Sequence, residues 1–186
     1  MGVTGLYGGA FDPPHVGHVE VARAAKDQLG IARLVVLVSE APGHKGTYLP
    51  ARARFELARA AFPDDDVRLD PHAFTIDMLR TGEFDDPLFV IGADQFCDLL
   101  AWKEPDAVLE LARLAVATRP GYLPERLEAV LRELEHQERV LFFDLEPNPA
   151  ASRDVRALAA AGEPLDGLVP AAVAALIEQR GLYREN

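Results

Sequence analysis

Short apolar runs alternate along this chain with longer stretches in which apolar residues recur at helical spacing. The runs are apolar throughout, as in strands that are covered on both faces of a sheet. The strands predicted from this pattern are Val3–Tyr7, Leu34–Ser39, Val67–Leu69, Leu88–Ile91, Leu114–Thr118 and Val140–Asp144.

Helical stretches separate and follow the predicted strands. They are expected at Val16–Leu29, Ala51–Phe62, from about Thr75, Asp94–Leu100, Pro124–Glu135, Ser152–Ala160 and Pro170–Gln179. This alternation predicts an α/β fold, a Rossmann-like doubly wound parallel sheet with helices on both faces. Ligands in such sheets bind beyond the carboxyl ends of the strands, at the switch point. The residues that follow each strand are therefore the candidates for chemistry.

Composition narrows the class of protein. A chain of 186 residues suits one domain over 1–186, in which the helical segment from about 150 to 186 completes the site. A net charge of −11 argues against a nucleic-acid partner, because duplex binding needs a basic patch. There is no apolar run of bilayer length and no signal-peptide pattern, so we expect no membrane partner and a cytoplasmic location. The single cysteine, Cys97, excludes an internal disulfide.

The segment Gly8–His18, after the first predicted strand, carries the strongest candidate chemistry. Gly8 and Gly9 let the backbone approach a ligand closely. His15 and His18 are three positions apart, so they share one face at the start of a helix, where free amides and the dipole favour anions. The segment predicts a phosphate site with two imidazole donors. The alternatives are a plain glycine turn with solvated histidines, or a zinc pair for which no third ligand is suggested nearby.

The complete string from Gly8 reads G-G-x-F-D-P-x-H-x-G-H. It resembles the H-x-G-H signature of the nucleotidyltransferase superfamily, in the form found in bacterial nicotinate (nicotinamide) mononucleotide adenylyltransferases. The resemblance implies that His15 and His18 engage the ATP phosphates and that neither is a covalent nucleophile. The ATP-binding residues it implies in this segment are Gly8, Gly9, Phe11, His15 and His18.

Lys45 follows the second predicted strand in a chain that has few lysines. An ammonium in that place can neutralise charge on a transferring phosphoryl group. The segment Pro42–Lys45 resembles the family's P-x-H-K element beside the triphosphate, which implies a catalytic and acceptor-binding role for Lys45. An ordinary solvated lysine is the alternative, and the same holds for one of Arg52 and Arg54 on the next helix.

Thr75 is the first candidate for the acceptor. The string His72–Leu79 resembles the family's Y-T-x-D-T-L segment, and the resemblance implies that Thr75 meets the pyridine carboxylate. Phe74 and Met78 stand here in place of residues that carry hydroxyl groups. Read without the resemblance, Thr75 caps a helix and Phe74 belongs to the core.

Gly92 and Asp94 follow the fourth predicted strand and match the family's G-x-D element, which implies a ribose contact; a helix cap is the alternative for Asp94. Trp102 is the only tryptophan. The resemblance implies that it stacks on the pyridine ring, whereas a lone tryptophan is more often part of the core.

Ser152 and Arg156 retain part of a phosphate motif. The segment resembles the family's I-S-S-T-x-x-R element, which holds the β- and γ-phosphates, but Ala151 replaces the first serine and Arg153 the threonine. Our hypothesis is that Arg153 and Arg156 hold these phosphates together. Read alone, Ser152 caps a helix whose arginines are exposed.

Taken together, these expectations describe the transfer of an adenylyl group from ATP to nicotinate mononucleotide in NAD biosynthesis. Mg²⁺ is expected to arrive with ATP, and no residue is assigned as a metal ligand. Alternatives are another phosphorylated acceptor, such as nicotinamide mononucleotide or phosphopantetheine, an alcohol phosphate with CTP, or a regulatory nucleotide-binding domain with impaired catalysis. A homo-oligomer is left open.

Overall fold

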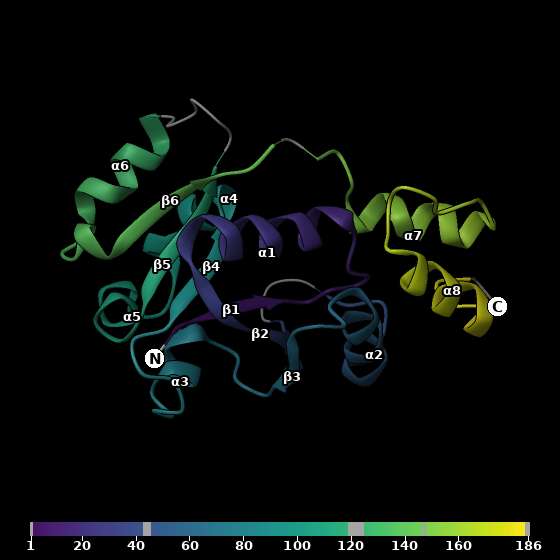
Figure 1. Cartoon of the computed structure of the whole chain (residues 1–186), viewed down its shortest axis with the longest axis horizontal. Helices are drawn as coiled ribbons and strands as arrows, with labels where there is room; N and C mark the ends of the chain where they lie inside the picture. Colours follow the sequence, from purple (N-terminus) through teal and green to yellow (C-terminus); the bar gives the residue numbers. More distant parts are fainter. Residues whose placement is uncertain (1, 43–45, 119–124, 147, 185–186) are drawn as a thin grey trace.

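A computed structural model describes residues 2–42, 46–118, 125–146 and 148–184, so Lys45 lies outside the described residues. Its strands form one parallel sheet in the order β3-β2-β1-β4-β5-β6 (Figure 1). The strands are β1 (Val3–Gly9), β2 (Ile31–Ser39), β3 (Asp66–Asp70), β4 (Leu88–Gly92), β5 (Arg113–Thr118) and β6 (Val140–Asp144). The predicted doubly wound fold is confirmed, and the strand order reverses between β1 and β4.

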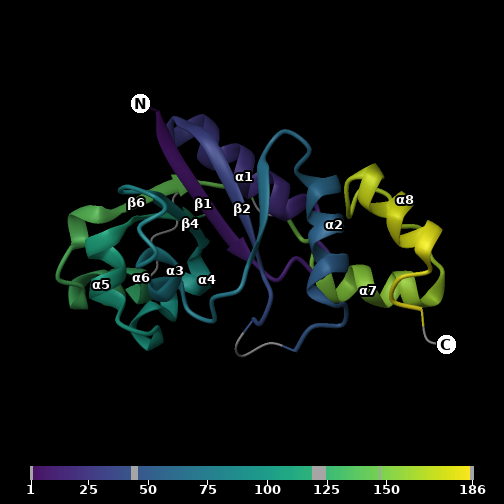
Figure 2. The same ribbon diagram turned by 90° about the horizontal axis from the view of Figure 1, so that it is seen from below.

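Helices cover both faces of the sheet (Figure 2). They are α1 (Val16–Leu29), α2 (Ala51–Ala61), α3 (Thr75–Leu79), α4 (Ala93–Cys97), α5 (Pro105–Leu111), α6 (Glu125–Glu133), α7 (Ser152–Ala161) and α8 (Ala171–Arg180), with short 3₁₀ turns η1 (Leu99–Ala101) and η2 (Gln137–Arg139). None of the helices in the described part of the chain is long and apolar enough to span a membrane.

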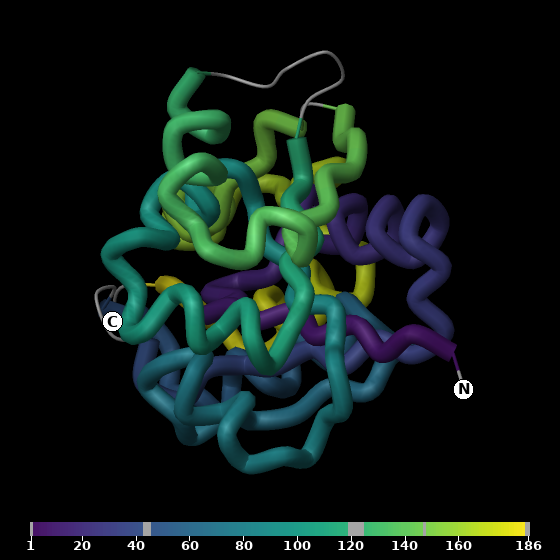
Figure 3. The backbone as a smooth tube through the Cα atoms, turned by 90° about the vertical axis from the view of Figure 1, so that its left-hand side faces the viewer, coloured from purple at the N-terminus to yellow at the C-terminus, as the bar shows by residue number. Residues whose placement is uncertain are grey.

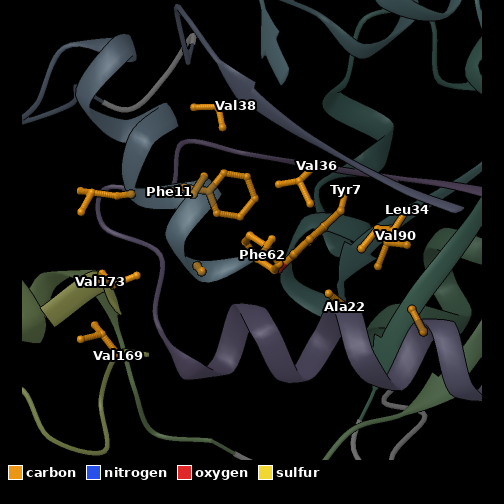
Figure 4. Packing of buried hydrophobic residues seen from close by; sticks show 14 of the residues in the cluster. Tyr7, Phe11, Ala22, Leu34, Val36, Val38, Phe62, Val90, Val169 and Val173 are labelled. Atoms are coloured by element: carbon orange, nitrogen blue, oxygen red, sulfur yellow. The ribbon is translucent and has the colours of Figure 1, made fainter. Parts of the chain in front are cut away.

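Each face of the sheet has its own apolar cluster, because neighbouring residues of a strand point to opposite faces. Tyr7 packs with buried residues of α1, α2, α7 and α8, whereas Leu6 packs with those of α3 to α6. Figure 4 shows the first cluster, in which Tyr7, Phe11 and Phe62 lie together. Seen from the side, α1 and the segment after β3 lie on opposite sides of β1 (Figure 3).

One predicted helix begins where it is expected but is shorter. The pattern indicates that Asp94–Leu100 begins a helix, and α4 starts at Ala93 but ends at Cys97, where the separate turn η1 follows. The next helix, α5, was not predicted, because so short a helix shows little periodicity. It begins with Pro105, which follows Glu104 in a left-handed conformation. Proline suits the first position of a helix, because its missing N–H has no partner there.

The glycine pair belongs to β1 itself. Gly8 pairs with Leu37 of β2 and Gly9 with Val38, so the strand runs two residues beyond its predicted end. A Cβ at Gly8 would lie 3.2 Å from the ring of Phe89. The glycine at this position is thus explained by packing against β4, in addition to the ligand approach that the sequence suggests.

Candidate functional site

A cavity of about 380 Å³ opens beyond the carboxyl ends of β1, β4 and β5. This is the switch point of the sheet, where doubly wound folds bind their ligands. Among the predicted site residues, those that line the cavity are His15, His18, Gly92 and Asp94. The sequence prediction of a site after β1 and β4 is therefore matched by a cavity at that place.

His15 and His18 form one unit at the start of α1. His15 occupies the N-cap position, and its backbone N–H donates to Nδ1 of His18 at 3.1 Å. In this arrangement His18 takes the part that glutamine or glutamate plays in a capping box. The two rings lie 3.8 Å apart between centroids, as expected for side chains on one face. Because Nδ1 of His18 accepts, its proton is assigned to Nε2, which can donate to a ligand.

The electrostatics of the pair favour neutral rings. Burial, aided by the neighbouring His15, lowers the pKa of His18 to about 3. Burial lowers the pKa of His15 to about 4, although Glu20 acts in the opposite direction. Both imidazoles are therefore uncharged at pH 7, and an incoming phosphate would raise both pKa values. The alternative of two solvated histidines does not fit rings that are partly buried and in close contact.

Gly17 and Phe11 fix the position of the pair. A Cβ at Gly17 would lie 3.1 Å from the ring of His15, so the glycine of the H-x-G-H signature makes room for that ring. Phe11 is 2% exposed, and its ring meets His18 edge-on with 5.2 Å between centroids. Its side chain supports His18 from within the core, which leaves only the Phe11 backbone for a contact with ATP.

The zinc alternative for the histidines lacks support in the described part of the chain. There, no group of three or more histidine, cysteine, aspartate or glutamate side chains could hold a metal ion. Divalent metals in such sites require several protein ligands.

The start of α7 lies beside the start of α1 (Figure 1). Ala151, and not Ser152, is the N-cap residue, so the reading of Ser152 as a cap is wrong. The Ser152 hydroxyl instead donates to the carbonyl of Pro13 at 2.8 Å. Arg156 donates from Nη1 to the carbonyl of Asp12 at 2.6 Å. Both side chains are therefore directed at the loop that leads into His15.

Arg153 behaves differently from Arg156. Its side chain is 84% exposed and pairs with the adjacent Asp154 at 3.2 Å. Arg156 is half-buried, and its guanidinium carbon lies 4.2 Å from the centroid of the Tyr48 ring. The described structure thus does not bring the two arginines into a shared contact.

Thr75 and Trp102, the two acceptor candidates among the described residues, lie on two joined segments outside the cavity lining. Lys103 pairs with Asp77 of α3 at 2.8 Å, and Arg80 pairs with Glu104 at 2.5 Å. These ion pairs place the segment of Thr75 against the segment of Trp102. The structure therefore brings the segments of Thr75 and Trp102 together.

The environments of Phe74, Thr75 and Asp94 differ from the simplest readings of the sequence, whereas that of Trp102 fits the core reading. Phe74 is the N-cap residue of α3, so Thr75 is not the cap, and Phe74 is 46% exposed instead of belonging to the core. Trp102 is partly buried and meets Phe89 edge-on at 6.4 Å between centroids. Asp94 likewise is not a cap, because Gly92 holds that position in α4.

Arg54 is a residue whose role the sequence reading missed. It is 1% exposed, and its guanidinium donates to the carbonyls of Ala10 at 2.6 Å and Leu49 at 3.0 Å. Burial lowers its pKa, while Asp12 acts in the opposite direction. Helical spacing carried a signal, since Arg54 lies three positions before the buried Leu57. Arg52 is the surface charge of this pair of arginines, with a side chain that is 90% exposed.

Comparison with known proteins identifies the class. The sequence profile of the cytidylyltransferase-like family matches residues 6–158 of the chain, which is most of its length. The match includes the histidine pair, the cavity and the start of α7. The fold and the site thus define a nucleotidyltransferase of the cytidylyltransferase-like family.

Curated relatives narrow the class further. A protein of Rubrobacter xylanophilus is 35% identical over 98% of this chain and 92% of its own length. A protein of Thermus thermophilus is 33% identical over 97% of this chain and 98% of its own. Both carry the name "Probable nicotinate-nucleotide adenylyltransferase". The chain belongs to the family of nicotinate-nucleotide adenylyltransferases.

Solved structures support the fold. A Plasmodium falciparum nicotinic acid mononucleotide adenylyltransferase complexed with NaAD superposes with a TM-score of 0.76 at 15% identity, covering 98% of each chain. The same enzyme complexed with APC gives a TM-score of 0.72. At this identity the likeness concerns the arrangement of the sheet and its helices.

Proposed function

We propose that this chain transfers the adenylyl group of ATP to nicotinate mononucleotide, which yields nicotinate adenine dinucleotide and pyrophosphate. The observation that carries the proposal is the close, neutral pair of His15 and His18 that lines the cavity at the switch point. The relatives' shared name supports the choice of acceptor. Action in the cytoplasm, apart from membranes and nucleic acid, is part of the same proposal.

The reaction is a direct displacement. A phosphate oxygen of the acceptor attacks the α-phosphorus of ATP, and the bond from that phosphorus to the oxygen that bridges to the β-phosphate breaks. Pyrophosphate leaves with the bonding electrons. The acceptor phosphate is already ionised at neutral pH, so no general base is needed. Catalysis then rests on positioning and on stabilisation of charge.

The triphosphate lies, in this proposal, between the starts of α1 and α7. Nε2–H of His18, the ring of His15 and the first amides of α1 donate to phosphate oxygens. Arg156, with Ser152 and Arg153, holds the β- and γ-phosphates. Lys45 is proposed to act on the transferring phosphate.

The remaining residues divide between the two nucleotides. Gly92 and Asp94, at the carboxyl end of β4, are assigned to the ribose of ATP. Thr75 is assigned to the pyridine carboxylate, and Trp102 to the pyridine ring. The ion pair between Lys103 and Asp77 supports these two assignments, because it holds the segment of Trp102 beside the segment of Thr75.

Mg²⁺ is proposed to enter with ATP. The described residues offer phosphate donors at the site but no carboxylate cage, and this combination fits a cation that is carried by its nucleotide. When bound, the ion supplies charge neutralisation on the phosphate oxygens.

A pyrophosphate-release assay tests the proposal. Purified protein is supplied with ATP and Mg²⁺ and with one acceptor at a time: nicotinate mononucleotide, nicotinamide mononucleotide or phosphopantetheine. We expect the highest kcat/KM with nicotinate mononucleotide. A preference for another acceptor would replace the proposed substrate. ATP binding without turnover would favour a regulatory domain with impaired catalysis, an alternative suggested by Ala151 and Arg153 in the altered phosphate motif.

A further inference from the structure

Asp12 is a buried carboxylate with partners from two distant parts of the chain. It is 6% exposed. Its Oδ1 accepts a hydrogen bond from the hydroxyl of Tyr183 at 2.7 Å. Its Oδ2 accepts from the backbone N–H of Tyr48 at 2.6 Å, with Leu49 N–H at 3.4 Å. Asp12 therefore fastens the C-terminal segment and the segment before α2 to one point.

The same residue lies in the loop that builds the phosphate site. The carbonyl of Asp12 accepts from Arg156, and the next carbonyl, that of Pro13, accepts from Ser152. Two residues further along the chain, His15 caps the start of α1. The place of the Asp12 carboxylate thus sets both the direction of Arg156 and the path of the chain into the histidine pair.

We propose that Tyr183 is a positioning residue for ATP binding, in which its hydroxyl holds Asp12 and Asp12 in turn fixes Arg156. The inference rests on the proposed function, since it assigns Arg156 to the triphosphate. Tyr183 does not line the cavity, so it acts through its partner.

The chemistry of the pair suits a fixed link. Burial, together with the Asp12 carboxylate, raises the pKa of Tyr183 well above its usual value, so the group remains a hydroxyl donor. Without this donor, a buried carboxylate oxygen loses its partner, and such a group is expensive to leave unpaired. The loop can regain a partner for Asp12 only by moving, and that movement displaces the carbonyl that holds Arg156.

The direct test is Tyr183→Phe, which removes one oxygen atom. We expect the dissociation constant of a non-hydrolysable ATP analogue to rise roughly tenfold, while KM for the acceptor stays unchanged. The matched control is Arg180→Ala, which loses an ion pair between α8 and Glu56 of α2 in the same C-terminal segment but does not touch Asp12. A purely structural role would affect both variants alike, through a lower Tm and a smaller active fraction.

A double-mutant cycle tests the route through Arg156. Tyr183→Phe and Arg156→Lys should be non-additive in ATP affinity, because both act on one contact. Additive effects, or an unchanged affinity in Tyr183→Phe, would overturn the proposal. Nucleotide binding is measured without acceptor, so these results stand even if no acceptor is adenylylated and the proposed function fails.

Asp12→Asn guards against a Tyr183→Phe protein that does not fold. The asparagine oxygen can accept from Tyr48 N–H while its amide donates to the Tyr183 oxygen, so the link survives without the charge. We expect an ATP affinity closer to wild type than that of Tyr183→Phe. An equal or larger loss would assign the effect to the buried charge and overturn the role of the link.

Discussion

His15, Gly17 and His18 show how one turn of helix can fix the chemistry of a site. The backbone N–H of His15 orients the ring of His18, the absence of a side chain at Gly17 admits the ring of His15, and the two rings touch. Each feature depends on a neighbour within three positions. The signature therefore works as a unit, whose parts are not expected to contribute independently.

His18→Gln separates the cap from the catalytic contact. Glutamine suits this position of a capping box, so the helix start should persist while the imidazole donor is lost. We expect kcat to fall roughly 10²–10³-fold, as for the loss of one donor to a developing charge. Steady-state kinetics give the result, and His136→Gln, at an exposed histidine beside Glu138, is the control. Near-normal turnover would remove His18 from the mechanism.

Gly17→Ala tests the fit of the His15 ring. Alanine favours a helix over glycine by about 1 kcal/mol, so stability alone would predict no harm. The added Cβ would press on the His15 ring, and we expect a clear drop in kcat with little change in the free energy of unfolding. Kinetics combined with denaturant unfolding decide the matter. Unchanged kcat would show that the ring can shift freely.

At the scale of elements, α7 contributes side chains to the proposed phosphate site although it lies far from α1 in the sequence. Arg156 is aimed at the loop, and Arg153 is solvated. If both hold the phosphates, Arg153 must leave Asp154 when ATP binds. We expect Arg156→Ala to weaken ATP affinity more than Arg153→Ala, and the double variant to weaken it most.

The measurement is calorimetric titration with ATP at low salt, where screening is weakest. Asp154→Ala serves as a companion variant, since it frees Arg153 from its only partner among the described contacts. An Arg153→Ala protein that binds ATP with wild-type affinity would contradict joint binding of the phosphates by the two arginines and would assign that role to Arg156 alone.

The proposed binding site for the acceptor is built from two elements, α3 and the segment between η1 and α5. Trp102→Ala should raise KM for the mononucleotide far more than KM for ATP, because the indole is assigned to the pyridine ring. Trp102→Phe keeps an aromatic face and should retain most of the affinity. Equal changes in both KM values, or a large loss of Tm in Trp102→Ala, would mean that Trp102 serves the core beside Phe89.

For the whole molecule, the neutral histidine pair predicts sensitivity to acid. The folded pKa of His18 is about 3, against 6.5 for the ordinary group, so between these values the unfolded chain binds more protons. The contribution of the neutral His18 to the free energy of unfolding is fully present above pH 6.5 and falls as the pH drops below that value. Between pH 7 and pH 5, wild type should lose about 2 kcal/mol more than His18→Gln. Urea unfolding measures this difference, and parallel profiles would contradict it.

The sequence predicted what is local. Runs of apolar residues located every strand, and helical spacing located most helices, because both patterns repeat within a few residues. Two short elements, α4 and α5, were misjudged, since a helix of five or seven residues offers little periodicity. The sequence analysis left open which of Arg52 and Arg54 is a surface charge, because the carbonyl partners that stabilise the buried Arg54 are not visible in the sequence.

Partners far apart in the chain could not be predicted in this way. His15 and His18 were recognised because the whole motif is contiguous. The contact of Tyr183 with Asp12 joins residues 171 positions apart, and no pattern in either segment announces it. The order of the strands is also a long-range property, and the sequence predicted only a doubly wound parallel sheet without giving that order.

The contacts of α7 and Tyr183 with the loop that leads into His15 have a consequence for how the protein folds during synthesis. Ser152, Arg156 and Tyr183 reach partners that lie 139, 144 and 171 positions earlier. A ribosome therefore releases the histidines long before it makes the residues that hold their loop. Contacts of such long range form late, because the intervening chain must first be ordered. A growing chain can thus build much of its sheet before the contacts that fix the loop leading into His15 are able to form.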